Sequence, residues 1–270
     1  MEKTKVLFVS QEITPYLPET EMSRTGRYLP QGIQERGKEI RTFMPKYGSI
    51  NERRNQLHEV IRLSGMNLII DETDRPLIIK VASIQSARMQ VYFIDNEDYF
   101  QRRYTLKDEN EEYFSDNDER AIFFARGVLE TIKKLRWSPD IVHCFGWFTS
   151  LVPLYLKHSY NEEPIFANSK VVYSVYNDEF DKPLRKEFKD KLKIEGINNK
   201  AIKKIKDNPD YVNLTKMTID NSDAVIKGSQ QINEKIEKYI QSLDMPILDY
   251  QPEDKYIDAY SELYDKLVTR

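Results

Sequence analysis

Short apolar segments alternate with stretches of helical periodicity along most of the chain. The segments that are predicted to be strands are Lys5–Ser10, Glu39–Met44, Leu77–Val81, Met89–Ile94, Asp140–Cys144, Val171–Val175 and Ala224–Lys227. Strand patterns that alternate with helical patterns are typical of a parallel sheet with helices on both of its faces. The pattern therefore predicts an α/β fold built on a doubly wound parallel sheet.

One part of the chain departs from this alternation. Between Gln56 and Ile94 the apolar segments follow one another with short turns and little helical pattern between them. Runs of strands joined by short turns are typical of hairpins and meanders. We therefore predict a β-rich insertion at about residues 56–94.

Helical periodicity is clearest in the second half of the chain. Asn117–Leu135 has an apolar stripe at helical spacing, and Asp116 or Asp118 can cap its first turn. Gln230–Leu243 and Pro252–Val268 are also predicted to be helices. The last of them places five apolar or aromatic residues on one face, namely Tyr256, Tyr260, Leu263, Tyr264 and Leu267.

Composition and charge narrow the classes of function. The 270 residues are 40% hydrophobic and 31% charged, and the net charge of −3 gives no basic field, so nucleic acid is not an expected partner. The one cysteine, Cys144, excludes an internal disulfide and a cysteine-rich zinc site. The chain enters a strand at once, without signal-peptide features, and has no apolar run of membrane-spanning length. A cytoplasmic protein that does not cross a membrane is expected.

Five segments carry recognisable motifs. Residues 5–48 supply a strand, a polar loop, a helix end and a second strand, and they are followed by Tyr113–Phe124 (YFSDNDERAIFF), Pro139–Thr149 (PDIVHCFGWFT), Val171–Asn177 (VVYSVYN) and Ile219–Val225 (IDNSDAV). In order and spacing these segments resemble the glycogen and starch synthases, glycosyltransferases that extend α-glucan from ADP-glucose or UDP-glucose. The resemblance implies the Rossmann-like, N-terminal half of a GT-B fold and a role in carbohydrate metabolism.

The resemblance also suggests domain limits. Residues 1–245 correspond to the N-terminal synthase domain, and residues 246–270 resemble the closing helix of full-length synthases, which packs back on that domain. The C-terminal domain, which holds most of the nucleotide-sugar site in the family, has no counterpart. The chain is therefore expected to be a synthase from which the second domain was removed, not one cut short.

The loop after the first strand departs from the family. A Lys-Thr-Gly-Gly-Leu loop meets the nucleotide sugar in family members, and the aligned residues 18–22 here read Pro-Glu-Thr-Glu-Met. Glu19 thus brings negative charge to a position where a diphosphate needs cations or backbone amides. Arg24 and Arg27 follow and could supply phosphate contacts, although an exposed helix face explains them as well. A solvated acidic loop without a ligand is the alternative for the whole segment.

A second departure concerns aromatic residues. The His-Asp-Trp-His motif of the family becomes Phe145-Gly146-Trp147-Phe148, so both imidazoles and the carboxylate are absent. Aromatic faces stack on sugar rings, so Phe145, Trp147 and Phe148 are candidates to line a glucan groove. Packing in the core at a strand–helix junction is the alternative.

The third departure lies directly after the predicted strand Val171–Val175. The histidine of the Thr-Ile-His-Asn motif, which contacts the transferred glucose in the family, corresponds to Tyr176, whereas Asn177 is retained. A phenol hydrogen-bonds but does not replace an imidazole near neutral pH. His143 and Glu12 also match family positions, and with Tyr176 and Asn177 they complete the candidates for the cleft lining.

Two functions follow from the resemblance. The first is a synthase-like domain that no longer transfers glucose by itself and binds α-glucan or a protein. The second is a working glucosyltransferase whose donor site comes from a second chain or from dimerisation. No catalytic residue is assigned. Glu19 and Tyr176 only mark two positions where family members have functional residues of another type. Neither a cofactor nor a metal is expected. A homodimer or a protein partner is expected on the face that the missing domain would cover.

Overall fold

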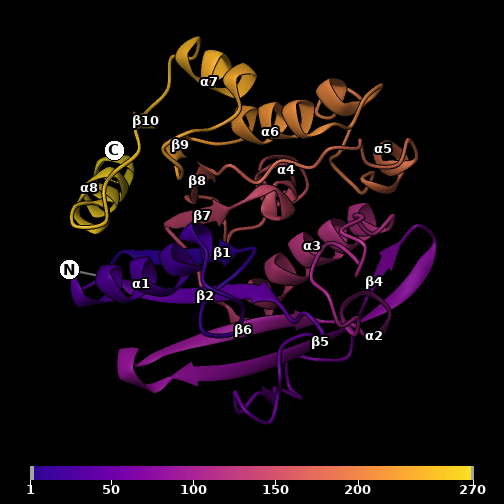
Figure 1. Ribbon diagram of the computed structural model, residues 1–270, viewed down its shortest axis with the longest axis horizontal. Helices are drawn as coiled ribbons and strands as arrows, with labels where there is room; N and C mark the ends of the chain where they lie inside the picture. The colour runs from indigo at the N-terminus through magenta and orange to yellow at the C-terminus, as the bar shows by residue number, and fades with distance from the viewer. Residues whose placement is uncertain (1–2, 269–270) are drawn as a thin grey trace.

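The computed structural model describes residues 3–268, so residues 1, 2, 269 and 270 of the predicted domains lie outside the described part. Its sheet has the strand order β10-β9-β8-β7-β1-β2-β6-β5-β3, with β4 paired to β5 outside this row (Figure 1). The strands are β1 (Lys5–Ser10), β2 (Glu39–Pro45), β3 (His58–Glu59), β4 (Met66–Ile70), β5 (Thr73–Ile84), β6 (Met89–Asp95), β7 (Ile141–Phe145), β8 (Lys170–Val175), β9 (Ala224–Lys227) and β10 (Ile247–Leu248). The α-helices are α1 (Glu21–Glu35), α2 (Glu97–Phe100), α3 (Asn117–Leu135), α4 (Leu151–His158), α5 (Phe188–Lys191), α6 (Tyr211–Asp220), α7 (Glu234–Gln241) and α8 (Tyr256–Val268).

The sheet is mostly parallel, which confirms the predicted α/β fold. All neighbours from β10 to β6 run parallel, whereas β5 pairs antiparallel with β3, β4 and β6. The β-rich segment at residues 56–94 therefore extends the edge of the central sheet. Its last strand, β6, pairs in parallel with β2 and so belongs to the parallel part of the sheet.

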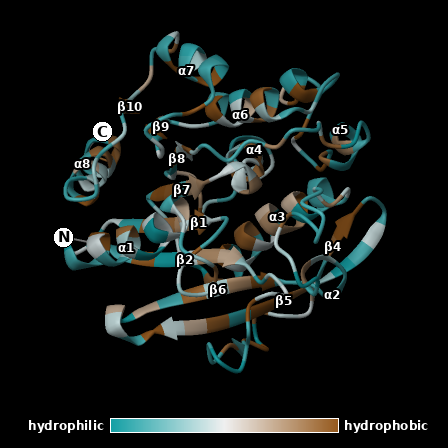
Figure 2. Cartoon of the chain, in the orientation of Figure 1, coloured by the Kyte–Doolittle hydropathy of each residue, from teal (hydrophilic) through white to brown (hydrophobic). Residues whose placement is uncertain are grey.

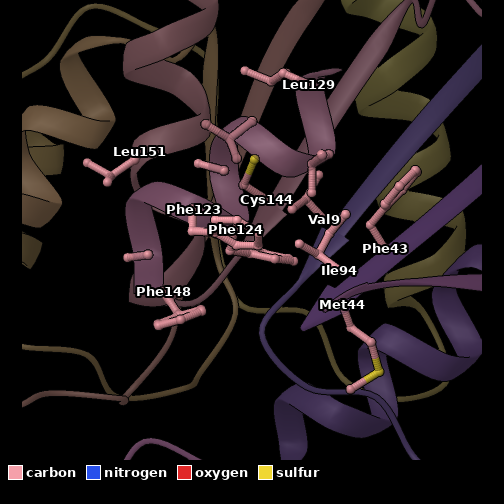
Figure 3. Packing of buried hydrophobic residues seen from close by; sticks show 14 of the residues in the cluster. Val9, Phe43, Met44, Ile94, Phe123, Phe124, Leu129, Cys144, Phe148 and Leu151 are labelled. Carbon is pink, nitrogen blue, oxygen red and sulfur yellow. The ribbon is translucent and has the colours of Figure 1, made fainter. Parts of the chain in front are cut away.

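Helices cover both faces of the sheet because the strands are apolar on both sides. In β1, Leu7 and Val9 face a large core together with residues of α3, α4 and α6, whereas Val6 and Phe8 face a second core under α1 and α8. Figure 3 shows Val9, Phe123, Phe124 and Phe148 in the larger core. Helices at the surface such as α6 and α7 carry both hydrophobic and hydrophilic residues (Figure 2). Within residues 3–268, every helix is too short or too polar to span a membrane.

Three details differ from the predicted helices. Asp116 is the N-cap residue of α3, but its carboxylate pairs with Arg102 instead of bonding the helix amides. Asp118 likewise pairs with Arg185 at 2.5 Å. The predicted helix at 230–243 is limited to Glu234–Gln241 because the Asn233 side chain accepts from the first backbone N–H groups of α7. The last helix begins at Tyr256, four residues after Pro252.

Helix α8 packs beside α1 on the face of the sheet that contributes to the second core (Figure 1). Tyr264 is fully buried, and its hydroxyl lies 2.5 Å from Nδ1 of His143 in β7. At the rim, Lys38 Nζ lies 2.9 Å from Asp265 and donates to the Ser261 hydroxyl at 2.8 Å. The end of the described chain is thus part of a packed core.

Candidate functional site

The carboxyl ends of β1, β7, β8 and β9 meet at one edge of the sheet. The chain order reverses beside β1, because β1 lies between β2 and β7. In open α/β sheets, ligands bind outside the carboxyl ends of the strands at such a switch point. Among the described residues, this edge borders a cavity beside α1 and α8 and another beside the loops after β7 and β8.

The first cavity, called here the α1–α8 cavity, has a volume of about 500 Å³. Its walls come from the start of α1, the turn after β9 and the segment that leads into α8. The acidic loop is part of it, since Glu19, Thr20 and Glu21 all line the cavity. This is the loop that the family resemblance places where a diphosphate would bind.

Thr20 holds the acidic loop at the start of α1. Its side chain accepts from the Ser23 N–H at 3.0 Å, and its own N–H donates to the Ser23 hydroxyl at 2.8 Å, which completes a capping box. The Thr20 hydroxyl also donates to Glu12. Burial raises the pKa of Glu12 above its usual value, and this hydrogen bond partly opposes the rise. The helix terminus is therefore closed by side chains of the chain itself.

The two arginines after the loop have different surroundings. Arg24 lines the α1–α8 cavity, where its Nε lies 3.2 Å from Glu19 and its guanidinium pairs with Glu253. Arg27 is 7% exposed, donates to Gln31 at 2.7 Å and lies 3.4 Å from the Ser86 hydroxyl. It lines neither cavity, so the expectation of a shared phosphate site for both arginines does not fit the geometry.

The second cavity, called here the β7–β8 cavity, has a volume of about 420 Å³. Its lining includes Gln11 after β1, Trp147 after β7, and Asn177 and Asp178 after β8. The segment at 104–113 adds Tyr104, Thr105, Leu106, Lys107, Asp108, Glu111 and Tyr113 to the lining, and Glu179 completes it. The arrangement combines aromatic edges with polar side chains, as a carbohydrate site requires.

Asp178 is the residue that sequence reasoning missed. Its Oδ2 accepts from the Trp147 N–H at 2.7 Å, and its Oδ1 accepts from the Tyr211 hydroxyl at 3.1 Å. Gln11 caps the next amide, since its Oε1 accepts from the Phe148 N–H at 3.0 Å. The sequence shows only an acid directly after the retained Asn177. Its partners, Trp147 and Tyr211, are brought to it by the fold.

Glycine at position 146 permits these contacts. Gly146 has a φ of +80°, and a Cβ atom there would lie 2.9 Å from both Asp178 Oδ2 and Gln11 Oε1. L side chains rarely adopt this backbone conformation. The carboxylate of Asp178, which follows β8, thus approaches this glycine closely.

The three aromatic residues next to Gly146 lie in the core. Phe145 and Phe148 are fully buried, on opposite faces of the sheet, and offer no surface to a sugar. Trp147 is 1% exposed and packs against Phe180 with ring centroids 4.8 Å apart, although it borders the β7–β8 cavity. The predicted groove of three aromatic residues is therefore replaced by core packing, which leaves Trp147 alone at the cavity wall.

His143 and Tyr176 are also core residues. His143 is fully buried between the Tyr264 and Ser174 hydroxyls, and burial lowers its pKa to about 3. It is therefore neutral at physiological pH and does not line the cleft. Tyr176 is 2% exposed, and its ring covers Gly228, where an added Cβ would lie 2.6 Å away. Asn177 is exposed in the β7–β8 cavity, and its N–H donates to the Ser229 hydroxyl at 3.2 Å.

Asp178 is expected to titrate near neutral pH. Burial, assisted by the charge of Glu12, raises its pKa to about 7 from the usual 3.8, against the opposing hydrogen bonds from Trp147 and Tyr211. Because the folded state binds this proton more tightly than the unfolded chain, the stabilising contribution is complete below the unfolded pKa and disappears as the pH rises through about 7.

The matched measurement compares the native chain with Asp178→Asn by urea unfolding at roughly pH 5 and pH 8. The native chain is expected to lose stability relative to the variant as the pH rises. His143 titrates in the opposite direction in both proteins, so its contribution cancels in the difference. A difference that is the same at both pH values would contradict the raised pKa.

No cluster of metal ligands accompanies either cavity. Among residues 3–268, no group of three or more His, Cys, Asp or Glu side chains is arranged to hold a metal ion.

Comparison with known sequences identifies a family and several relatives of this chain. A family model described as the starch synthase catalytic domain matches residues 5–245. The glycogen synthase of Chlorobium limicola is 40% identical over 174 residues, which are 64% of this chain and 36% of that protein. The glycogen synthase of Chlorobaculum tepidum is 38% identical over 210 residues, which are 71% of this chain and 41% of that protein. The chain thus spans well under half the length of these relatives.

A solved structure agrees in fold. The catalytic domain of starch synthase IV from Arabidopsis thaliana, bound to ADP and acarbose, superposes with a TM-score of 0.68 over 83% of this chain and 45% of that one. The sequences are 17% identical over the match, so the comparison supports the architecture and not the chemistry of the site.

Proposed function

The chain belongs to the starch synthase catalytic domain family, and we propose that it binds α-glucan without transferring glucose by itself. The proposal separates two abilities that a full synthase combines at one cleft. Binding of the nucleotide sugar depends on cations and free amides. Binding of glucan depends on aromatic edges and polar side chains.

The charge of the α1–α8 cavity carries the first half of the proposal. Glu19, Glu21 and Glu253 line it, and Arg24 is the one lysine or arginine among its lining residues. Both Glu19 and Glu253 already pair with Arg24. A diphosphate would have to enter beside three carboxylates, and such like charges repel. The capping box at Thr20 also occupies the Ser23 N–H, one of the helix amides that can bind phosphate at such a terminus.

The β7–β8 cavity supports the second half. Tyr104 is 38% exposed and Tyr113 is half-buried, so both can present ring surface to a sugar in addition to the edge of Trp147. Asn177 and Asp178 lie at the same wall and can exchange hydrogen bonds with sugar hydroxyls. The wall of this cavity thus offers both kinds of contact that a glucan requires.

Two measurements on the purified chain test the proposal. Maltoheptaose is expected to bind in calorimetry, and Tyr104→Ala is expected to weaken binding about fivefold because a stacking surface is lost. The exposed Tyr28, which lines the other cavity, provides the control variant Tyr28→Ala, which should bind normally. Incubation with labelled ADP-glucose or UDP-glucose and glycogen is expected to incorporate no label. Turnover would refute the non-catalytic half, and absence of maltoheptaose binding would refute the other.

A second candidate function keeps transferase activity. The relatives are named glycogen synthases, and Asn177 and an acid of near-neutral pKa remain at the cleft edge. Under this alternative, a second chain supplies the donor site through the face that the C-terminal domain of the family would cover. Activity would then depend steeply on protein concentration and would accompany a dimer or a hetero-complex in light scattering. A monomer without turnover would contradict it.

A further inference from the structure

The α1–α8 cavity is separate from the proposed glucan site. The two cavities share no lining residue. Its wall joins segments that are far apart in sequence, because Glu21 accepts from the Ser229 hydroxyl at 2.6 Å and Arg24 pairs with Glu253.

The charges of this cavity are unbalanced. Three carboxylates face it, and a single guanidinium, that of Arg24, opposes them. Neighbouring tyrosines reflect the same negative potential. Burial and then the charge of Glu253 raise the pKa of Tyr256 to about 12. Burial, Glu21 and Glu253 together raise the pKa of Tyr250. An anion is therefore disfavoured here, and a cation is favoured.

Aromatic rings surround the same space. Tyr28 is 48% exposed and Tyr250 is 37% exposed, and both line the cavity with the half-buried Tyr256. Tyr256 packs edge-on against Tyr260, with ring centroids 5.8 Å apart and an interplanar angle of 85°. The face of an aromatic ring attracts cations, and several rings beside carboxylates form the usual cage for an organic ammonium group.

Behind the wall of the cavity lies the buried phenol of Tyr176, which is not itself a lining residue. The Tyr176 ring packs on Gly228, which lines the cavity, and the groups that act on its hydroxyl, Thr25 and Tyr260 among them, line it too. The hydroxyl has no hydrogen-bond partner of good geometry among the described residues. The nearby Thr25 hydroxyl donates to the Glu21 carbonyl at 3.0 Å.

We propose that the α1–α8 cavity binds an organic cation, an alkylammonium or guanidinium group, which lies between the tyrosine rings and donates to the Glu21 and Glu253 carboxylates. Arg24 now occupies part of this space from within the chain. The cation can come from a free polyamine or from a lysine or arginine side chain of another protein, since both present the same group.

Calorimetry with spermidine, with agmatine and with a lysine-containing tripeptide tests the proposal on the whole chain. The native protein is expected to bind at least one of them, and the acetyl-lysine form of the tripeptide is expected not to bind. Tight binding of spermidine or agmatine points to a free cation, whereas stronger binding of the tripeptide points to a side chain. Absence of binding by all three probes would overturn the proposal.

Two variants are expected to change the affinity for spermidine in opposite directions. Arg24→Gln removes the competing cation and is expected to tighten spermidine binding about fivefold. Two unit charges about 4 Å apart in water interact by about 1 kcal/mol, which corresponds to this factor. Glu253→Gln is expected to weaken it by about the same factor. Asp254→Asn removes a neighbouring exposed carboxylate that does not line the cavity, so its binding should be unchanged. Weaker binding in Arg24→Gln, or equal binding in all variants, would refute the site.

The inference does not rest on glucan binding. Tyr104→Ala, which lies in the other cavity, is expected to bind spermidine normally. Tyr28→Ala is expected to bind maltoheptaose normally but to bind spermidine more weakly. Competition of spermidine by ADP or by maltoheptaose would assign the α1–α8 cavity to those ligands and overturn the proposal, whatever the result of the glucan experiment.

Discussion

Replacing Tyr264 with alanine is expected to lower the free energy of unfolding by about 3–5 kcal/mol. The side chain is fully buried in the smaller core, and its ring contacts Phe8 edge-on with centroids 6.4 Å apart. Truncation leaves a cavity and removes the hydroxyl that bonds Nδ1 of the buried His143. An imidazole nitrogen without a partner in the core adds to the loss.

Urea unfolding measures this change, and two control variants separate its causes. Tyr264→Phe removes only the hydroxyl and is expected to lose about 1–3 kcal/mol. Glu262→Ala changes an exposed residue of the same helix and should change stability by less than about 0.5 kcal/mol. An alanine variant at position 264 that is as stable as the native chain would show that α8 is dispensable for the core. The exposed pairs of α8, such as Arg36 with Asp258, are not expected to compensate.

The hydrophobic pattern predicted the sheet well because most strands are buried on both faces. Lys5–Ser10 and Ala224–Lys227 were predicted with the limits that the structure has, and α3 was predicted with its observed limits as well. Limits shifted where a side chain decided the start of a helix. Asn233 caps α7 several residues after the predicted start, and such a choice depends on local hydrogen bonds that periodicity does not contain.

The site was harder to predict because its contacts connect distant parts of the chain. Asp178 meets Trp147 across 31 positions, and Glu21 meets Ser229 across 208. The sequence shows an acid in each place but not which amide or hydroxyl it reaches. Aromatic residues posed a related difficulty. Phe145 and Phe148 are of a residue type that often lines sugar-binding surfaces, yet both are buried. Only the assembled sheet shows whether such a residue lies at the surface or in the core.

Replacing Gly146 with alanine is expected to lower the free energy of unfolding by about 2–6 kcal/mol and to disassemble the wall of the β7–β8 cavity. Two causes act together. The backbone has φ +80° and ψ 164°, a conformation that is largely restricted to glycine. The new Cβ would also lie 2.7 Å from Met22 Cε and 2.9 Å from Asp178 Oδ2 and Gln11 Oε1.

Gly65 offers a control that separates these causes, because it has a φ of +87° and no atom lies within 4 Å of the position that a Cβ would take there. Gly65→Ala is expected to lose about 1–3 kcal/mol from backbone strain alone. The excess loss in Gly146→Ala includes the collision that pushes Asp178 and Gln11 away from the amides of Trp147 and Phe148. Maltoheptaose binding should then fall in Gly146→Ala and persist in Gly65→Ala under conditions where both are folded. Equal losses of stability with binding intact in both would show that the contacts of Asp178 and Gln11 do not depend on this glycine, and that the glucan site does not depend on those contacts.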